Sequence, residues 1–193
     1  MRIETERLVL RPWREDDAAT LFRYASEPEV GLSAGWAPHT SVEGSLNVLR
    51  TILMKDHNFA ITIKPSDEAV GSVGIFPGHN ERQNGEYEIG YWIAKPFWGN
   101  GYVPEAVRAL LSLYFSFGAE RIWCAHAEAN DKSRRVIEKV GFRYQFTAPW
   151  EAPIGGVRNT RYYALTAEEF GTLYALTYKA LRHMESTDKS KED

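Results

Sequence analysis

The spacing of hydrophobic and polar positions along the chain predicts alternating strands and helices. Runs in which apolar residues recur at every second position, bounded by turn residues, predict seven strands, at residues 8–11, 59–64, 70–76, 86–93, 121–127, 142–146 and 158–165. Apolar residues three and four positions apart predict five helices, at residues 15–25, 40–53, 106–117, 130–140 and 168–184. This order of elements indicates an α+β fold with a mixed, mostly antiparallel sheet and one or two parallel crossovers.

The segment between the first two predicted helices carries a tryptophan, Trp36, among glycines and prolines. Pro28 is expected to end the first helix, so residues 31–39 are predicted to form an irregular loop. A capping box at Thr40-x-x-Glu43 is expected to begin the second helix. A loop of this kind often lines a functional site; a tryptophan that closes the edge of the core is the alternative interpretation.

Length and composition are typical of one globular domain. The chain has 193 residues, of which 44% are hydrophobic, and no repeat or linker divides it, so we expect one domain over residues 1–185 and a polar tail over residues 186–193. The net charge of −3 argues against a broad basic surface for nucleic acid. The single Cys124 excludes an intrachain disulfide, and no apolar run approaches the roughly 20 residues of a membrane span. We therefore predict a cytoplasmic protein with no membrane partner, either a monomer or a homodimer.

The clearest candidate for binding chemistry is the stretch Phe97–Ala106, which lies between a predicted strand and a predicted helix. Gly99 and Gly101 lack the Cβ atoms that would keep the backbone away from a ligand. The first-turn N–H groups of the helix have no intrahelical partners and, with the helix dipole, favour an anion. Pro104 stands where the dinucleotide fingerprint has its third glycine, and no Gly-Lys-Ser/Thr follows, so neither familiar nucleotide loop is present. We predict a pyrophosphate cradle, with an ordinary surface turn as the alternative.

Two carboxylates, Glu86 and Glu88, lie on one face of the predicted strand before this turn, because side chains two positions apart in a strand point the same way. A polar cleft explains them if the strand is central, and contact with solvent explains them if the strand lies at the edge of the sheet. The five histidines show no metal-ligand spacing, so we expect no metal.

Several motifs occur together in the order found in one enzyme superfamily. They are Glu6–Pro12 with Asp16–Ala18, Glu88–Ile93, Trp98–Ala106, and Asn130-x-x-Ser133 followed by Glu138–Phe142. With these motifs the chain resembles, from about Ile3 to Phe170, the GNAT superfamily of acyl-CoA N-acyltransferases, and within it the RimJ/RimL-like N-terminal acetyltransferases of ribosomal proteins. The resemblance implies a GNAT-type sheet of about seven strands, splayed between its fourth and fifth strands and flanked by helices.

The resemblance also implies acetyl-CoA as the acyl donor. Backbone amides of the glycine turn would hold its pyrophosphate, the free end of the fourth strand would pair with the pantetheine amides, and the helix after the fifth strand would contact the pantetheine arm. By position, the residues of the glycine turn are Trp98, Gly99, Asn100, Gly101, Tyr102 and Val103. The free end of the fourth strand is Trp92, Ile93 and Ala94, and the helix residues are Asn130 and Ser133. Trp98 and Val103 depart from the usual Gln or Arg and the usual Gly or Ala, and Val103 crowds the amides. Arg134 either reaches the CoA phosphates or belongs to a solvated helix face.

An amine that attacks a thioester must lose a proton, and the leaving thiolate needs one. The resemblance implies an N-acetyltransferase that moves an acetyl group from acetyl-CoA to a primary amine. Because Cys124 has no nearby His–acid pattern, we predict direct attack in a ternary complex. Glu88 is the candidate base, or it orients the loop around Trp36; Glu86 and Trp36 are candidate contacts to the acceptor. Ser133 is the candidate acid, or a helix cap, because Ile137 replaces the tyrosine usual in the superfamily.

Two alternatives remain open from the sequence. A CoA-binding regulatory or interaction module with little or no catalysis would fit the missing tyrosine, although the paired carboxylates argue against it. Among enzymes, the acceptor is either a protein N-terminus or a small amine such as a polyamine, an amino sugar or an antibiotic.

Overall fold

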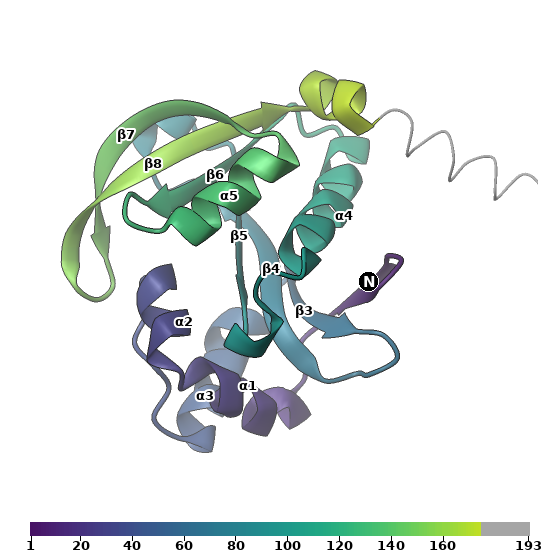
Figure 1. Ribbon diagram of the computed structural model, residues 1–193, viewed down its shortest axis with the longest axis vertical. Helices are drawn as coiled ribbons and strands as arrows, with labels where there is room; N and C mark the ends of the chain where they lie inside the picture. Colours follow the sequence, from purple (N-terminus) through teal and green to yellow (C-terminus); the bar gives the residue numbers. More distant parts are fainter. Residues whose placement is uncertain (175–193) are drawn as a thin grey trace, which may run out of the picture.

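The computed structural model describes residues 1–174, in which one eight-stranded sheet is flanked by helices (Figure 1). The strands, in the order in which they lie side by side, are β1 (Ile3–Glu4), β2 (Leu8–Arg11), β3 (Asn58–Ile63), β4 (Ala69–Pro77), β5 (Tyr87–Ile93), β6 (Arg121–Ala127), β8 (Gly156–Thr166) and β7 (Arg143–Ala152). Neighbouring strands are antiparallel except β5 and β6, which are parallel. The predicted α+β class is confirmed, and the strand beyond the expected seven is the two-residue β1.

Helices cover both faces of this sheet. They are η1 (Glu15–Asp17), α1 (Ala18–Ala25), α2 (Pro28–Ala34), α3 (Val42–Val48), η2 (Leu49–Leu53), η3 (Glu81–Gln83), η4 (Lys95–Phe97), α4 (Tyr102–Ser116) and α5 (Asp131–Val140). Residues 167–174 are helical as well. The rest of the predicted closing helix, to residue 184, and the predicted tail, residues 186–193, lie outside the described residues.

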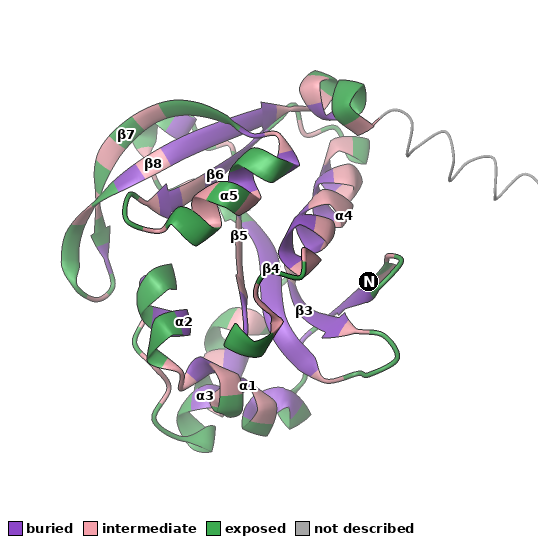
Figure 2. Cartoon of the chain, viewed as in Figure 1, coloured by how far each residue is buried: buried purple, intermediate pink, exposed green. Residues whose placement is uncertain are grey.

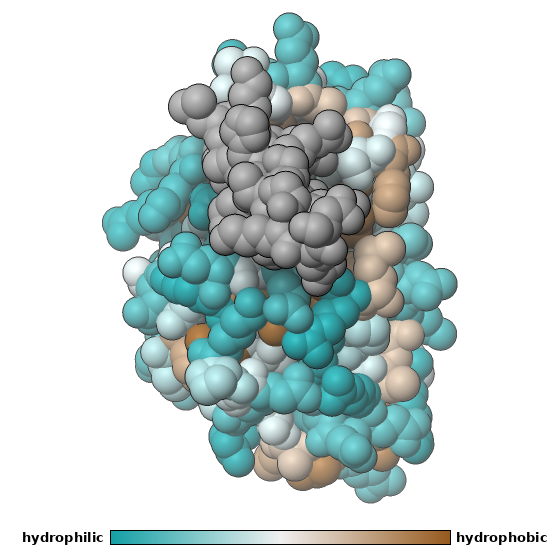
Figure 3. Space-filling view, turned by 90° about the vertical axis from the view of Figure 1, so that its right-hand side faces the viewer, coloured by the Kyte–Doolittle hydropathy of each residue, from teal (hydrophilic) through white to brown (hydrophobic). Residues whose placement is uncertain are grey.

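Alternation along the strands sends neighbouring side chains into two separate cores. Ile61 of β3 and Val70 of β4 pack with α4 in the larger core, while the adjacent Ala60 and Ala69 pack with α1 in the smaller one. Figure 2 shows the result, because the central strands are largely buried whereas each helix also exposes a face. Hydrophilic residues dominate the surface that Figure 3 shows. No helix within residues 1–174 is both long and apolar enough to cross a membrane.

Two local predictions about the N-terminal helices are wrong. Pro28 begins α2 instead of only ending the helix before it, because the first helical position needs no backbone N–H donor. The first part of the predicted loop 31–39 is therefore helical. The cap of α3 is Ser41 and not Thr40, since the Ser41 hydroxyl accepts a hydrogen bond from the Gly44 N–H at 3.0 Å.

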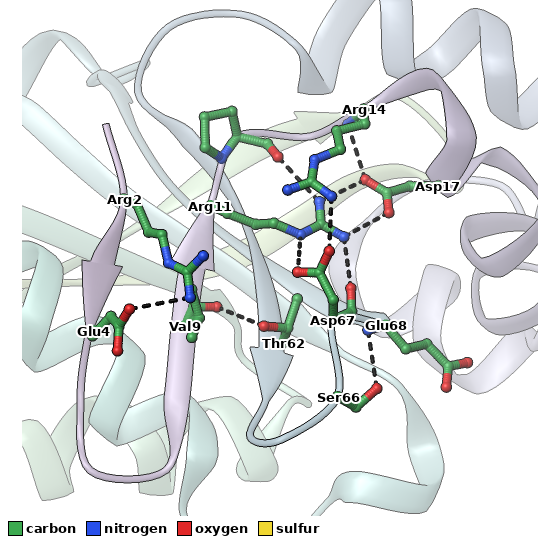
Figure 4. Close-up of polar contacts among 11 residues, drawn as sticks. Arg2, Glu4, Val9, Arg11, Arg14, Asp17, Thr62, Ser66, Asp67 and Glu68 are labelled. Atoms are coloured by element: carbon green, nitrogen blue, oxygen red, sulfur yellow. Dashed lines mark hydrogen bonds and ion pairs between the residues drawn. The ribbon is translucent and has the colours of Figure 1, made fainter.

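A buried guanidinium ties β2 to η1 and to the turn between β3 and β4 (Figure 4). Arg11 is only 2% exposed, and its Nη1 and Nη2 atoms donate to the two carboxylate oxygens of Asp17 at 2.8 and 2.7 Å. Its Nε donates to Asp67, in the turn before β4, at 2.8 Å. A buried charge without a partner is costly, so this group holds β2, η1 and the β3–β4 turn in one arrangement.

The parallel pair β5–β6 opens along its length, as the resemblance implies. The two strands pair only through Tyr87 with Ile122 and Glu88 with Trp123, and beyond these residues they separate. The edge of β5 that faces β6 therefore lacks a strand partner over most of its length, and a cleft opens between the two halves of the sheet.

Candidate active site

The cleft between β5 and β6 has a volume of about 630 Å³, which is within the usual range for small-molecule sites. Its walls come from α2, the two parted strands, the glycine turn before α4, and α5. Of the residues predicted to act in binding or catalysis, those that line it are Trp36, Glu88, Trp92, Ile93, Trp98, Gly99, Gly101, Tyr102, Val103, Asn130 and Ser133. Glu86, Ala94, Asn100 and Arg134 do not line it.

The glycine turn presents a row of free backbone donors. Gly99 and Gly101 both have φ of +78°, in the left-handed region that other residues rarely adopt, and Gly101 caps the 15-residue helix α4. None of the backbone N–H groups of residues 99–103 donates a hydrogen bond within residues 1–174. Five unpaired donors at the positive end of a long helix form a site for an anion.

The start of the chain holds this turn in place. The Arg7 guanidinium donates to the Asn100 carbonyl at 3.0 Å, and it lies 4.7 Å from the centroid of the Tyr102 ring. It also pairs with Glu105 at 2.6 Å, while the Thr5 hydroxyl donates to the same carboxylate at 2.6 Å. Burial opposes ionisation of Glu105, but these hydrogen bonds outweigh it and lower the pKa of the carboxyl. The one carboxylate in the first turn of α4 is thus neutralised before an anion arrives.

Basic residues reach the cleft from α5. Lys132 Nζ lies 3.7 Å from the centroid of the Trp98 ring, and Arg135 also lines the cleft. Arg134, which the sequence analysis considered for the CoA phosphates, pairs instead with Asp131 at 3.1 Å and Glu138 at 3.3 Å along the helix surface. Positive charge is therefore available beside the cradle, but from the neighbours of Arg134.

Glu88 lies at the point where β5 and β6 part. It is 5% exposed, and its Oε2 atom accepts from Gln83 Nε2 at 2.6 Å and contacts His79 Nδ1 at 3.2 Å. The other ring nitrogen of His79 lies 3.0 Å from the Tyr162 hydroxyl, and the hydrogen bond to Glu88 raises the pKa of His79. Glu88 Oε1 has no hydrogen-bond partner within residues 1–174. One carboxylate oxygen is therefore held in place, and the other is free to accept a proton.

Glu86 is not part of this arrangement. Its carboxylate accepts from the Arg121 guanidinium at 2.8 Å and from the Trp123 indole at 2.6 Å. The hydrogen bond from Arg121 also lowers the pKa of Glu86. The two carboxylates that the sequence places on one face of the strand thus have separate partners, and only Glu88 lines the cleft.

Two hydroxyls meet on the opposite wall. The Ser133 hydroxyl of α5 lies 2.9 Å from the hydroxyl of Tyr91, which reaches across from β5. Burial raises the pKa of Tyr91 well above its usual value. Asn130, not Ser133, supplies the side-chain cap of α5, because its Oδ1 atom accepts from the Ser133 N–H at 3.0 Å. Ile137 lies in the larger core, so the missing tyrosine leaves no gap in the cleft.

The buried thiol of Cys124, on β6, is not suited to act as a nucleophile. Cys124 is 1% exposed on β6, and burial, with the nearby charge of Glu88, raises its pKa well above the usual value. A protonated thiol is a poor nucleophile, so the arrangement does not favour an acyl-cysteine intermediate.

A family model for the acetyltransferase (GNAT) domain matches residues 7–143. The chain belongs to the GNAT acetyltransferases. Over 145 residues it is 31% identical to p20 of Bacillus licheniformis, named as an uncharacterized N-acetyltransferase, with 72% of this chain and 80% of that one covered. YdaF of Bacillus subtilis (strain 168), whose name proposes a ribosomal N-acetyltransferase, is 35% identical over 100 residues, or 50% of this chain and 55% of YdaF. A solved GNAT-family acetyltransferase from Bacillus anthracis superposes with a TM-score of 0.74 at 26% identity, covering 88% of this chain and 100% of that one.

Several residues at the site of this GNAT acetyltransferase escaped the sequence analysis. Neither Tyr91 nor His79 was singled out from the sequence, where Tyr91 is one residue of the motif Glu88–Ile93 and His79 is one of five histidines. Arg7 is 98 positions from Glu105, its partner at the cradle. Arg7, Tyr91 and Lys132 each lie inside a quoted motif, Glu6–Pro12, Glu88–Ile93 and Asn130-x-x-Ser133 respectively, and that position was the signal that could have found them. His79 lies in no motif, and its role follows only from its contacts with Glu88 and Tyr162.

Proposed function

We propose that this GNAT acetyltransferase moves an acetyl group from acetyl-CoA to a primary amine by direct attack within a ternary complex. One observation carries the proposal: the glycine turn with its unpaired backbone donors and the buried Glu88, which has one carboxylate oxygen without a partner, line the same cleft. The first feature suits the pyrophosphate of CoA, and the second suits the removal of a proton from an amine.

The residues of the cleft fit the parts of acetyl-CoA. The N–H groups of residues 99–103, with Lys132 and Arg135, would hold the phosphates, and Asn130 and Ser133 would contact the pantetheine arm. The unpaired edge of β5 offers backbone groups near Trp92 for the pantetheine amides. The Ala94 N–H is not available, because it already donates to the Val70 carbonyl at 2.8 Å. When bound, acetyl-CoA supplies an electrophilic thioester carbonyl.

Glu88 is suited to prepare the acceptor. An α-amine has a pKa of about 7.7–8.0 and is mostly protonated at neutral pH, whereas only its neutral form attacks. Glu88 Oε1 can take that proton while Gln83 and His79 keep the Oε2 atom in position. These contacts do not involve the segment around Trp36, so they favour a role as base over a role in orienting that segment. The buried, protonated Cys124 supports direct transfer.

Ser133 is suited to supply the proton that the departing sulfur needs. Its hydroxyl lies in the cleft, 2.9 Å from Tyr91 Oη. Tyr91 Oη holds the Ser133 hydroxyl in place and keeps its own proton, because burial raises its pKa. Water can replace the proton that Ser133 gives up, so Ser133 provides the hydroxyl that Ile137 cannot.

Acetyl-CoA titration with a thermal-unfolding readout, followed by a thiol-release assay on a panel of amines, tests this function. Glu88→Gln keeps the side-chain volume and is expected to lower kcat by about 10²–10⁴-fold, while acetyl-CoA still stabilises the protein. The matched control is Glu86→Gln, which removes a carboxylate outside the cleft and should keep kcat within a few-fold of the wild type.

Each other outcome has a definite meaning. Stabilisation by acetyl-CoA without turnover of any amine would favour a CoA-binding module. Failure of both CoA and acetyl-CoA to stabilise the protein would contradict the cradle. Full activity of Glu88→Gln would remove Glu88 as the base while leaving the transferase function intact.

A further inference from the structure

We propose that the acceptor is a primary amine that carries one positive charge beside a bulky apolar or aromatic group. Aromatic monoamines and peptide N-termini with an apolar first residue share this chemistry. The inference rests on the proposed function and narrows it, because polyamines, amino sugars and aminoglycosides fall outside the class.

The charges along the cleft suit a single ammonium group. Within residues 1–174, Glu88 is the only carboxylate residue that lines it, and its Oε1 atom is unpaired. The cationic side chains that line it are Lys132, Arg135, Lys139 and Arg158. With Lys132 and Arg135 held by the phosphates of CoA, a second ammonium group on the acceptor would still find no other carboxylate there and would meet Lys139 or Arg158, which disfavours binding.

Aromatic side chains line the cleft along the strand that carries Glu88 and beside its partner His79. Phe76 lies directly opposite it in the β4–β5 pair. The Trp150 ring centroid is 5.4 Å from that of His79, which contacts the Glu88 carboxylate. On the strand that carries Glu88, Trp92 meets Trp36 edge to face, with ring centroids 6.0 Å apart. Phe76, Trp36, Trp92 and Trp150 all line the cleft, so an apolar body attached to the amine has surfaces against which it can pack.

Two polar side chains on these walls, Ser72 and Asn58, already have partners inside the protein. The Ser72 hydroxyl donates to the Phe59 carbonyl and accepts from the Trp13 indole, both at 3.2 Å. The Asn58 amide donates to a backbone carbonyl of η2 at 3.3 Å. Ser72 and Asn58 therefore have little hydrogen-bonding capacity left for the several hydroxyls of a sugar, which would lose their bonds to water on binding. The buried Thr160 hydroxyl has no partner within residues 1–174 and offers one hydrogen bond to the acceptor.

Steady-state kinetics at saturating acetyl-CoA test the inference with tryptamine, the peptide Phe-Gly-Gly, ethylamine, Gly-Gly-Gly, spermidine, glucosamine and kanamycin. We expect kcat/KM for tryptamine or Phe-Gly-Gly to exceed that of its small counterpart, ethylamine or Gly-Gly-Gly, by at least about 100-fold, from burial of one aromatic group. Preference for tryptamine would indicate a metabolite, and preference for Phe-Gly-Gly a protein N-terminus.

Variants of the cleft test whether the preference comes from packing of the acceptor's aromatic group against the tryptophans. Trp36→Ala should lower kcat/KM for the preferred aromatic acceptor about 10-fold more than for its small counterpart. Phe117→Ala, a matched control whose side chain is exposed outside the cleft, should leave this ratio unchanged. If Trp36→Ala does not fold, Trp150→Ala tests the same point on the wall beside His79.

The opposing results are equally clear. The highest kcat/KM for spermidine, glucosamine or kanamycin would overturn this inference and leave the acetyltransferase function standing. An unchanged ratio in the folded tryptophan variant would also overturn it. No turnover of any amine would overturn the proposed function, and the inference with it.

Discussion

Replacing Gly99 by alanine tests whether the conformation of the glycine turn is what binds the donor. Gly99 has φ of +78°, and a Cβ atom added there meets no heavy atom within 4 Å. The substitution therefore creates no clash, and its cost is the left-handed backbone itself, about 1–2 kcal/mol. Gly85, in the loop before β5, is a matched control, because its φ is +73° and an added Cβ again meets nothing within 4 Å.

Both variants should lose similar stability but differ in binding. A loss of about 1–2 kcal/mol corresponds to a fall in Tm of about 2–8 °C for a chain of this size. If the turn relieves the strain at position 99 by rotating φ to negative values, at least one N–H group turns away from the phosphates. One lost hydrogen bond to a charged group, about 1.5–3 kcal/mol, weakens acetyl-CoA binding about 10- to 150-fold.

Calorimetric titration with acetyl-CoA, alongside thermal unfolding, measures both quantities on each variant. Gly85→Ala should bind acetyl-CoA as the wild type does, since Gly85 does not line the cleft. Wild-type affinity in Gly99→Ala, or an equal loss of affinity in both variants, would refute the assignment of the donor site to the backbone amides of this turn.

Three further predictions concern other parts of the molecule. Asp17→Asn leaves the buried guanidinium of Arg11 without its main partner and should lower the free energy of unfolding, measured in urea, by about 3–5 kcal/mol. Asp67→Asn is the control: the Asp67 side chain is 58% exposed, so the loss should be under about 1 kcal/mol. Equal losses in the two variants would contradict the argument. The pKa of His79 is raised in the folded state, so its protonation stabilises the fold fully at pH values below the unfolded pKa of about 6.5. The difference in free energy of unfolding between wild type and His79→Gln should therefore narrow as pH rises through the folded pKa. A difference that widens would be inconsistent with this argument. Ser133→Ala should lower kcat by about 10²-fold or more and Tyr91→Phe by less, whereas the reverse order in a thiol-release assay would make Tyr91 the acid.

Local features of this protein were readable from its sequence. The glycine turn depends on backbone conformation and on the start of the helix that follows, and both are properties of adjacent residues. The order of strands and helices follows from short-range periodicity in the same way. Errors arose where neighbouring signals competed: Pro28 both ends one helix and begins the next, and Ser41 caps α3 in place of Thr40.

The composition of the site was decided by tertiary structure. Tyr91 approaches Ser133 from 42 positions away only because β5 and β6 separate and α5 packs beside the opening. Glu86 and Glu88 are alike in sequence, yet only Glu88 lines the cleft, because Arg121 and Trp123 reach one carboxylate and not the other. A strand pattern says which side chains share a face, but the partners that pair, bury or expose them come from distant segments whose positions the whole fold sets.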